Sequence, residues 1–297
     1  MFNKHKVFES SEGNVWKYIF EKDTAVAEAV LYRYENFYKR TVICCSTMSG
    51  CPVGCTFCGT GKKFIANLTA EEIVQQILHI LQDKDIEDIN EKGERFQIMF
   101  MSMGEPMLNF DEVERAIRTL HALYPNAELL LSTIGPNKPK AFNRLLKLSK
   151  EISKVGLQFS IHKSIDEERN ELIPYKNKMT LDQIRDYGII WWKETGRHPY
   201  LNYCVDGDNN YLIDFLNLSA RFSPIIFNFT FSVVCSADEN MKDKGFKELD
   251  VINEFCNKFL KAGYNTRIFD PAGQDDIGEG CGQLWYVQKW MKEHTNY

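Results

Sequence analysis

The run Thr41-Val-Ile-Cys-Cys-Ser46 is closely followed by Cys51-Pro-Val-Gly-Cys55-Thr-Phe-Cys58, so three cysteines with the spacing C-x3-C-x2-C come directly after a strand-like segment. Three thiolates on one short loop can bind three irons of a cubane and leave the fourth iron without a protein ligand. An open metal position distinguishes a reactive site from a closed structural one. The glycines at 50 and 54 allow tight turns around a bulky inorganic group. We therefore predict that Cys51, Cys55 and Cys58 bind a [4Fe–4S] cluster.

A zinc site is the alternative interpretation of these cysteines. A structural zinc ion normally has four Cys or His ligands. Between Cys58 and Arg95 the chain offers only His79 as a fourth ligand, and His79 falls in a predicted helix. The spacing therefore favours the iron–sulfur interpretation.

Outside this motif, apolar runs typical of strands alternate with helical patterns. The strand-like runs cover residues 41–46, 96–101, 128–131, 156–161, 201–205, 225–231 and 266–269. The helical patterns cover residues 69–81, 110–123, 139–148, 181–194, 211–219 and 250–261. Such alternation builds parallel βαβ units, as a barrel or as an open sheet, and the chemistry then lies at the carboxyl ends of the strands. Two further strand-like runs, 15–20 and 26–34, precede these units.

Composition excludes several classes of protein. The 297 residues carry a net charge of −5, which argues against a broadly basic nucleic-acid binder. Ten lysines and arginines lie between Lys138 and Lys178, either as a local basic surface or as solvated helix faces. Nine cysteines without a secretory signal indicate metal or redox chemistry rather than a disulfide scaffold. No apolar run is long enough to cross a bilayer, so we expect a cytoplasmic protein that does not contact membranes.

The cysteine motif, with the aromatic Phe57 before its last cysteine, resembles the signature of the radical S-adenosylmethionine (SAM) superfamily. The resemblance implies a partial (β/α)6-type TIM barrel, over residues 40–297, after a short N-terminal β extension over residues 1–39. It also implies that the open iron binds SAM and cleaves it to a 5′-deoxyadenosyl radical. Phe57 would pack near the SAM adenine.

Further segments resemble one branch, the RlmN/Cfr-type RNA adenine methyltransferases, which modify adenine at C2 or C8. The matching segments are 44–51 (CCSTMSGC), 67–69 (NLT), 101–109 (MSMGEPMLN), 131–135 (LSTIG), 160–162 (SIH), 169–174 (RNELIP) and 280–284 (GCGQL). The resemblance implies an RNA substrate, such as ribosomal or transfer RNA, and an electron donor such as flavodoxin or ferredoxin. It leaves open which RNA and which ring carbon are modified.

The resemblance also implies residues that bind SAM. Gly104 and Glu105 would bind its ammonium group, and Ser132 and the backbone of Ser160 to His162 would line its ribose and methionine side. Each residue has a simpler interpretation, since Ser132 could cap the next helix and His162 could be a satisfied structural histidine. Their position at successive strand ends favours the binding role.

Two further cysteines receive catalytic roles from the resemblance. Adenine C2 and C8 are poor nucleophiles, and the family overcomes this by covalent catalysis. Cys281, in a glycine-rich segment, would first accept a methyl group from SAM. A second SAM would yield the radical that takes a hydrogen from this S-methyl group, and the resulting carbon radical would add to the adenine ring and link Cys281 to the substrate. Cys44 would take a proton from the ring carbon and close a disulfide with Cys281, which releases the product. Cys45 points to the opposite face of its strand and is the weaker candidate; alternatively, Cys44 and Cys281 are buried small apolar residues.

Glu28 resembles a family glutamate that hydrogen-bonds or deprotonates the target adenine. The chain also departs from the family. We expect it to lack the helical N-terminal domain that contacts RNA, and the family asparagine that binds SAM has no clean match, since Asn228 comes too early. Two other functions therefore remain open. One is a radical SAM enzyme that abstracts hydrogen from a partner protein, and the other is a non-enzymatic iron–sulfur regulator.

Overall fold

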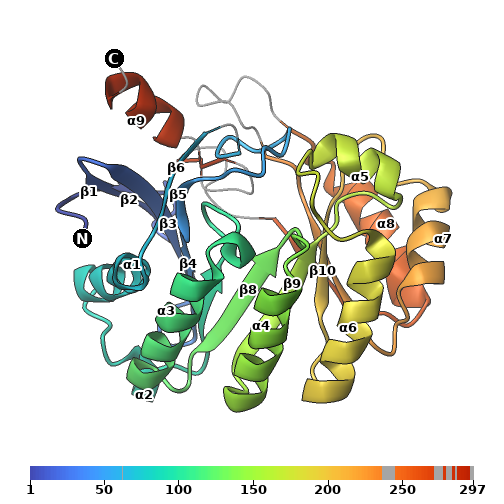
Figure 1. Cartoon of the computed structure of the whole chain (residues 1–297), viewed down its shortest axis with the longest axis horizontal. Coiled ribbons are helices and arrows are strands. Elements are labelled where there is room, and N and C mark those ends of the chain that lie inside the picture. Colours follow the sequence, from blue (N-terminus) through green and yellow to red (C-terminus); the bar gives the residue numbers. More distant parts are fainter. Residues whose placement is uncertain (62, 236–244, 271–276, 279–282, 285, 295–297) are drawn as a thin grey trace.

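The computed structural model describes residues 1–61, 63–235, 245–270, 277–278, 283–284 and 286–294. Figure 1 shows one large curved sheet with most of the helices packed against its outer face. The sheet has ten strands in the order β1-β2-β3-β4-β7-β8-β9-β10-β11-β12. Its first three strands pair antiparallel with one another, and β3 pairs antiparallel with β4; they are β1 (Lys4–Glu9), β2 (Val15–Lys22) and β3 (Ala25–Tyr34).

The remaining strands of the large sheet all run parallel. They are β4 (Arg40–Cys45), β7 (Phe96–Phe100), β8 (Glu128–Thr133), β9 (Val155–Ser160), β10 (Tyr200–Cys204), β11 (Asn228–Ser232) and β12 (Thr266–Phe269). A separate antiparallel hairpin of β5 (Met48–Gly50) and β6 (Phe64–Asn67) encloses the cysteine motif. The predicted partial barrel of parallel strands, with an N-terminal β extension, is thus confirmed.

Helices connect the parallel strands. They are α1 (Ala70–Asp83), α2 (Ile89–Lys92), α3 (Phe110–Leu123), α4 (Pro139–Glu151), α5 (Asp166–Leu172), α6 (Leu181–Thr195), α7 (Leu212–Arg221), α8 (Leu249–Lys261) and the C-terminal α9 (Tyr286–His294), with a 3-10 turn η1 (Pro106–Leu108) after β7. The predicted capping box of α1 is present, because Thr69 Oγ1 accepts from the Glu72 amide and Glu72 Oε2 accepts from the Thr69 amide. None of the helices in the described ranges is long and apolar enough to span a bilayer.

Side-chain alternation along β4 separates two apolar layers. Ile43 and Cys45 belong to the large core between the sheet and its helices, whereas Val42 and Cys44 belong to a smaller cluster inside the barrel. The predicted boundary between residues 39 and 40 falls in the turn between β3 and β4. Since these two strands are hydrogen-bonded neighbours, the extension and the barrel share one sheet.

The curvature of the sheet brings its distant strands together. The ring of Tyr32 on β3 meets the ring of Phe269 on β12, with centroids 6.3 Å apart. The two strands lie seven places apart in the sheet order. This contact therefore closes the sheet around an interior space, and parallel alignment puts the carboxyl ends of β4 to β12 at one edge of that space.

The β5–β6 hairpin requires glycine at position 50. Gly50 has a φ of +73°, and a Cβ there would lie 2.0 Å from the carbonyl oxygen of Lys63. That oxygen accepts a hydrogen bond from the Cys51 amide at 2.7 Å. A side chain at position 50 would thus displace the Lys63 backbone, which holds the amide of the first cysteine of the motif.

We expect Gly50→Ala to destabilise the protein far more than Gly196→Ala. Gly196 has a similar φ of +69° but no atom within 4 Å of an added Cβ. Gly196→Ala should cost about 1–2 kcal/mol for the left-handed backbone alone, and Gly50→Ala a further 1–3 kcal/mol or so for the clash. Urea unfolding of the two variants measures the difference, and equal costs would show that the hairpin tolerates the side chain.

Candidate active site

A cavity of about 460 Å³ occupies the interior of the barrel. Most of the residues proposed from the sequence line it. They are Cys44, Cys51, Cys55, Phe57, Cys58, Gly104, Glu105, Ser132, Ser160 and His162. Glu28 does not line this cavity, and Cys281 lies outside the described residues. The parallel strands therefore bring together side chains that are more than 100 positions apart in the sequence.

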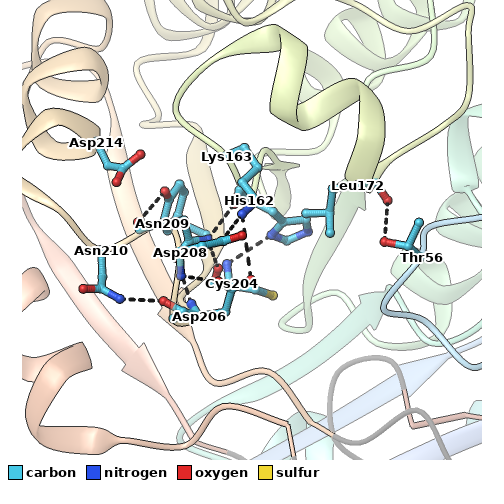
Figure 2. Close-up of polar contacts among 12 residues, drawn as sticks. Thr56, His162, Lys163, Leu172, Cys204, Asp206, Asp208, Asn209, Asn210 and Asp214 are labelled. Carbon is cyan, nitrogen blue, oxygen red and sulfur yellow. Dashed lines mark hydrogen bonds and ion pairs between the residues drawn. The ribbon is translucent and has the colours of Figure 1, made fainter.

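The cysteine loop is fixed at both of its ends. The Cys51 amide donates to Lys63 O beside the hairpin, and the Thr56 amide donates to Leu172 O at the end of α5 at 3.0 Å. Figure 2 shows the Thr56 hydroxyl facing the backbone carbonyl oxygen of Leu172, to which it also donates at 3.4 Å. Gly54 adopts a φ of +78°, which an L side chain would disfavour. The loop is therefore held open around its three thiols by backbone contacts.

This donor set fits a [4Fe–4S] cluster. Cys51, Cys55 and Cys58 all open onto the same cavity. Three thiols on one loop that face one cavity can bind three irons of a cubane and leave the fourth iron open.

Glu105 ties the carboxyl end of β7 to that of β8. Its Oε1 accepts from Thr133 Oγ1 at 2.5 Å and from the Met107 amide at 3.0 Å, and its Oε2 accepts from the Ile134 amide at 2.8 Å. Burial raises the pKa of Glu105 to about 7, although these hydrogen bonds favour the ionised form. A buried carboxylate that borders the cavity is suited to bind an ammonium group. The preceding Gly104 has a φ of +101° and packs against Met48, so a side chain there would clash.

His162 combines a structural and a cavity-lining role. Its backbone has a φ of +60°, and its Nδ1 accepts from the Cys204 amide at 3.1 Å, a contact visible in Figure 2. Burial, and to a lesser degree the charge of Arg169, lowers the pKa of His162 to about 3. The imidazole is therefore neutral at physiological pH and carries its proton on Nε2. Its ring packs edge-on against Phe57, with centroids 5.2 Å apart.

Polar side chains on the inner faces of β8 to β11 form two hydrogen-bonded groups. Ser132 Oγ lies 3.5 Å from Ser160 Oγ and accepts from Gln158 Nε2 at 3.1 Å. Ser132 does not cap α4, whose N-cap is Lys138, so that simpler interpretation is wrong. Ser232 Oγ donates to Asn202 Oδ1 at 2.7 Å, and both line the cavity.

Gln158, Asn202 and Ser232 were not singled out from the sequence. Each is a polar residue within an apolar strand, at one of the alternate positions whose side chains face the barrel interior. That pattern could have identified them from the sequence. Asn228, considered as a SAM ligand, is buried at the start of β11 and is not among the lining residues. Asn202 is the asparagine that borders the cavity.

Cys44 and Cys45 point to opposite faces of β4, as strand alternation predicts. Cys44 lines the cavity, and Cys45 is fully buried in the core beneath the helices. Burial raises the pKa of the Cys44 thiol to about 12. Cys44 is therefore a neutral thiol at physiological pH in this environment.

Glu28 is fully buried in an ion pair with Lys17, whose Nζ lies 2.9 Å from its Oε2. Burial raises the pKa of Glu28, and the nearby Lys17 charge opposes that shift. Glu28 Oε1 accepts from the Tyr286 amide at 2.8 Å, and Lys17 Nζ donates to Gly278 O at 2.9 Å. The pair thus holds the chain before and after Cys281, which is between these two attachment points in the sequence.

Thr60, on the cysteine loop, adds a third attachment. Its Oγ1 donates to Leu284 O at 2.5 Å. The C-terminal segment is consequently bonded both to the β extension and to the loop that carries Cys51, Cys55 and Cys58.

The chain is similar to proteins of one superfamily. The family model for the radical SAM superfamily matches residues 45–190. The ribosomal RNA large subunit methyltransferase N of Nitrosopumilus maritimus is 34% identical over 94% of this chain and 79% of its own length. A probable dual-specificity RNA methyltransferase RlmN of Thermus thermophilus is also 34% identical, over 95% of this chain and 77% of its own. The crystal structure of a radical SAM methyltransferase from Sphaerobacter thermophilus superposes with a TM-score of 0.80 and 25% identity, covering 95% of this chain and 80% of that one.

We expect removal of one partner of the Lys17–Glu28 pair to be strongly destabilising. Lys17→Met leaves a buried carboxylate without its counter-charge, which should cost about 3–5 kcal/mol in urea unfolding. The double variant Lys17→Met/Glu28→Gln should cost less than the sum of the single changes. Lys39→Met is the control, because Lys39 and Glu94 form an exposed pair that should contribute under about 1 kcal/mol. A Lys17→Met cost no larger than that of the control would contradict the buried pair.

The raised pKa of Cys44 predicts the pH dependence of its alkylation. Because only the thiolate reacts, the rate of iodoacetamide labelling should rise about tenfold per pH unit and reach no plateau below about pH 12. Mass spectrometry of the Cys44 peptide follows the reaction. In urea-unfolded protein the same peptide should level off above about pH 9, near the ordinary thiol pKa. Restricted access to the Cys44 thiol lowers the labelling rate at every pH but does not change the pH at which the rate levels off. A plateau near about pH 8.5 in the folded protein would therefore contradict the raised pKa of Cys44.

Proposed function

Since the chain belongs to the RlmN-type methyltransferases of the radical SAM superfamily, we propose that it methylates a ring carbon of adenine, C2 or C8, in RNA. The observation that supports this most strongly is the shared cavity of Cys44 and the cysteines at 51, 55 and 58. A radical SAM enzyme of another reaction type needs the three cysteines of the motif but does not require a further thiol in the same cavity.

The superfamily uses a [4Fe–4S] cluster and SAM. When bound, the cluster supplies the electron that cleaves SAM. We assign Cys51, Cys55 and Cys58 as its ligands. The carboxylate of Glu105, next to Gly104, would orient the SAM ammonium, and the hydroxyl layer of Ser132 and Ser160 would receive its polar groups.

The aromatic edge of the cavity suits the adenine of SAM. Phe57 and the neutral imidazole of His162 pack edge to face. Because His162 is held through Nδ1 by the Cys204 amide, it supplies a fixed wall with no charge. An uncharged aromatic wall favours a flat purine ring over an ionic group.

Covalent catalysis overcomes the low nucleophilicity of the adenine carbons. We propose that Cys281 carries the methyl group as a thioether. The 5′-deoxyadenosyl radical from a second SAM would take one hydrogen from that group, the methylene radical would add to the ring carbon, and the adduct would lose one electron, which the oxidised cluster can take back. Cys44 would then take the proton from the ring carbon and attack the sulfur of Cys281. The disulfide forms as the bond from that sulfur to the methylene carbon breaks, the carbon takes up a proton to become the methyl group, and an external reductant restores both thiols. As a neutral thiol Cys44 cannot accept a proton. We therefore expect product release to accelerate as pH rises toward its pKa of about 12.

For Glu28 the geometry supports a positioning role. Its carboxylate is engaged by Lys17 and by the Tyr286 amide and lies outside the cavity lining, so we do not assign it a contact with the substrate adenine. By holding residues 278 and 286 together with Lys17, it would limit the region that Cys281 can reach.

The names of the relatives support the RNA class of substrate. One acts on the ribosomal RNA large subunit, and others are described as dual-specificity RNA methyltransferases. We accordingly propose ribosomal or transfer RNA as the substrate, with a small redox protein such as flavodoxin or ferredoxin as the electron donor. A single-stranded or flipped adenine can enter a cavity of this kind, whereas a stacked one cannot.

The test is mass spectrometry of the Cys281 peptide from protein purified anaerobically. We expect one added methyl group, absent when Cys51, Cys55 and Cys58 are all changed to Ala. With RNA and reductant, Cys44→Ala should leave RNA covalently linked to the protein, because no thiol can release it. Cys256→Ala, which removes another buried cysteine away from the cavity, should turn over normally.

An unmodified Cys281 in protein that still cleaves SAM would contradict the methyl-carrier mechanism. Continued SAM cleavage by Cys281→Ala, together with hydrogen abstraction from a protein, would point instead to a radical SAM enzyme of another type.

A further inference from the structure

The cavity extends beyond the cofactor end of the barrel. Three arginines that line it belong to the opposite, amino-terminal edge of the parallel strands. Arg40 is the first residue of β4, Arg95 immediately precedes β7, and Arg267 is the second residue of β12. We call these three residues the arginine mouth. It is separated from the cysteine loop by the length of the strands.

The three arginines differ in the partners that hold them. Arg95 pairs with the carboxylate of Glu128 at 3.0 Å. Arg40 donates through Nε to Gln97 Oε1 at 3.1 Å, and Arg267 donates through Nε to Thr230 Oγ1 at 2.8 Å, so both of these bonds go to neutral oxygens. The three guanidinium groups and Glu128 together leave a net charge of +2 at this mouth.

Aromatic rings hold two of the guanidinium groups in place. Arg40 lies over the ring of Tyr34 at 4.3 Å, and Arg267 lies over the ring of Tyr200 at 5.0 Å. Tyr34 ends the antiparallel β3 and Tyr200 begins β10, so both rings belong to the same edge of the sheet. A contact of this kind restrains a guanidinium group without using its N–H donors.

The arginine mouth brings three positively charged side chains close together. The pKa of Arg267 is lowered, first by burial and then by factors that include the charges of Arg40 and Arg95. Positive groups brought together in a partly buried mouth repel one another, and an anion between them would relieve that repulsion.

A buried amide further inside the cavity is also incompletely bonded. Gln158, on β9, is 8% exposed and lines the cavity. Its Nε2 donates to Ser132, but its Oε1 has no hydrogen-bond partner among the described residues. A buried amide oxygen without a partner costs free energy, so a ligand group that donates to it would be favoured.

We propose that the arginine mouth binds a small phosphate monoester or inorganic phosphate. A phosphate monoester carries nearly two negative charges at about pH 7 and accepts several charge-assisted hydrogen bonds, which matches the net positive charge and planar donors of the mouth. A hydroxyl or amino group on the rest of such a molecule could reach toward Gln158. The proposal does not depend on methylation of RNA, because binding at this mouth needs neither SAM nor turnover.

The test is isothermal titration of the anaerobically purified holoprotein with inorganic phosphate, at an ionic strength held constant with chloride. Arg267→Gln and Arg40→Gln should each weaken binding about tenfold or more, since each removes a charged donor. Arg185→Gln is the matched control, because Arg185 is paired with Asp182 and Asp186 on α6 and lies outside the cavity. Cluster absorbance confirms that each variant is folded, and Arg267→Lys, which retains the charge, should recover part of the affinity.

Competition separates a free monoester from the RNA backbone as the source of the phosphate. Adenosine 5′-monophosphate should displace phosphate, whereas an RNA oligonucleotide with a 5′-hydroxyl, which carries only singly charged diesters, should not. Displacement by the oligonucleotide alone would assign the mouth to the RNA backbone and overturn the proposal. Absence of phosphate binding at millimolar concentration, or equal binding by Arg267→Gln and Arg185→Gln, would overturn it as well.

Discussion

The parallel alignment of β4 with β7 to β12 is the constraint on which the site depends. In a parallel sheet the carboxyl ends of all the strands lie at the same edge of the sheet. A residue that follows β4 therefore lies at the same edge as the residues that end β7, β8, β9 and β10. Glu105 shows how this edge is stabilised, because its carboxylate bonds η1 and the β8 end at once. No local sequence pattern requires that contact; it exists because the sheet brings the two loops together.

The same alignment explains why much of the molecule could be predicted from the sequence. Strands buried on both faces read as continuous apolar runs, and each predicted strand and helix is present with ends displaced by at most three residues. Motif residues that follow those runs, such as Gly104 and Ser132, were therefore expected at the same edge of the sheet, and both line the cavity. Short elements without such a signal were not predicted: the β5–β6 hairpin, α5 and α9 depend on tertiary contacts rather than on periodicity.

The roles of individual side chains were harder to predict than their locations. The environment of Glu28 could not be anticipated, because its partners Lys17 and Tyr286 come from separate parts of the chain. The protonation states of Cys44 and His162 also follow from burial, which a sequence does not state. At the carboxyl edge of the strands the cavity wall thus combines the neutral His162 and the protonated Cys44 with the carboxylate of Glu105, while three arginines gather at the amino-terminal edge.

The attachment of the C-terminal segment has a consequence for the order of assembly. Lys17 bonds to Gly278 and Glu28 bonds to Tyr286 across more than 250 residues of sequence. During synthesis the N-terminal strands emerge first, and these bonds can form only when residues 278 to 286 leave the ribosome. The barrel with its cysteine loop can therefore fold before this segment docks onto it. A chain that stops short of residue 278 would keep the three motif cysteines but leave Lys17 and Glu28 without these bonds, so completion of translation adds the partners that this buried pair holds.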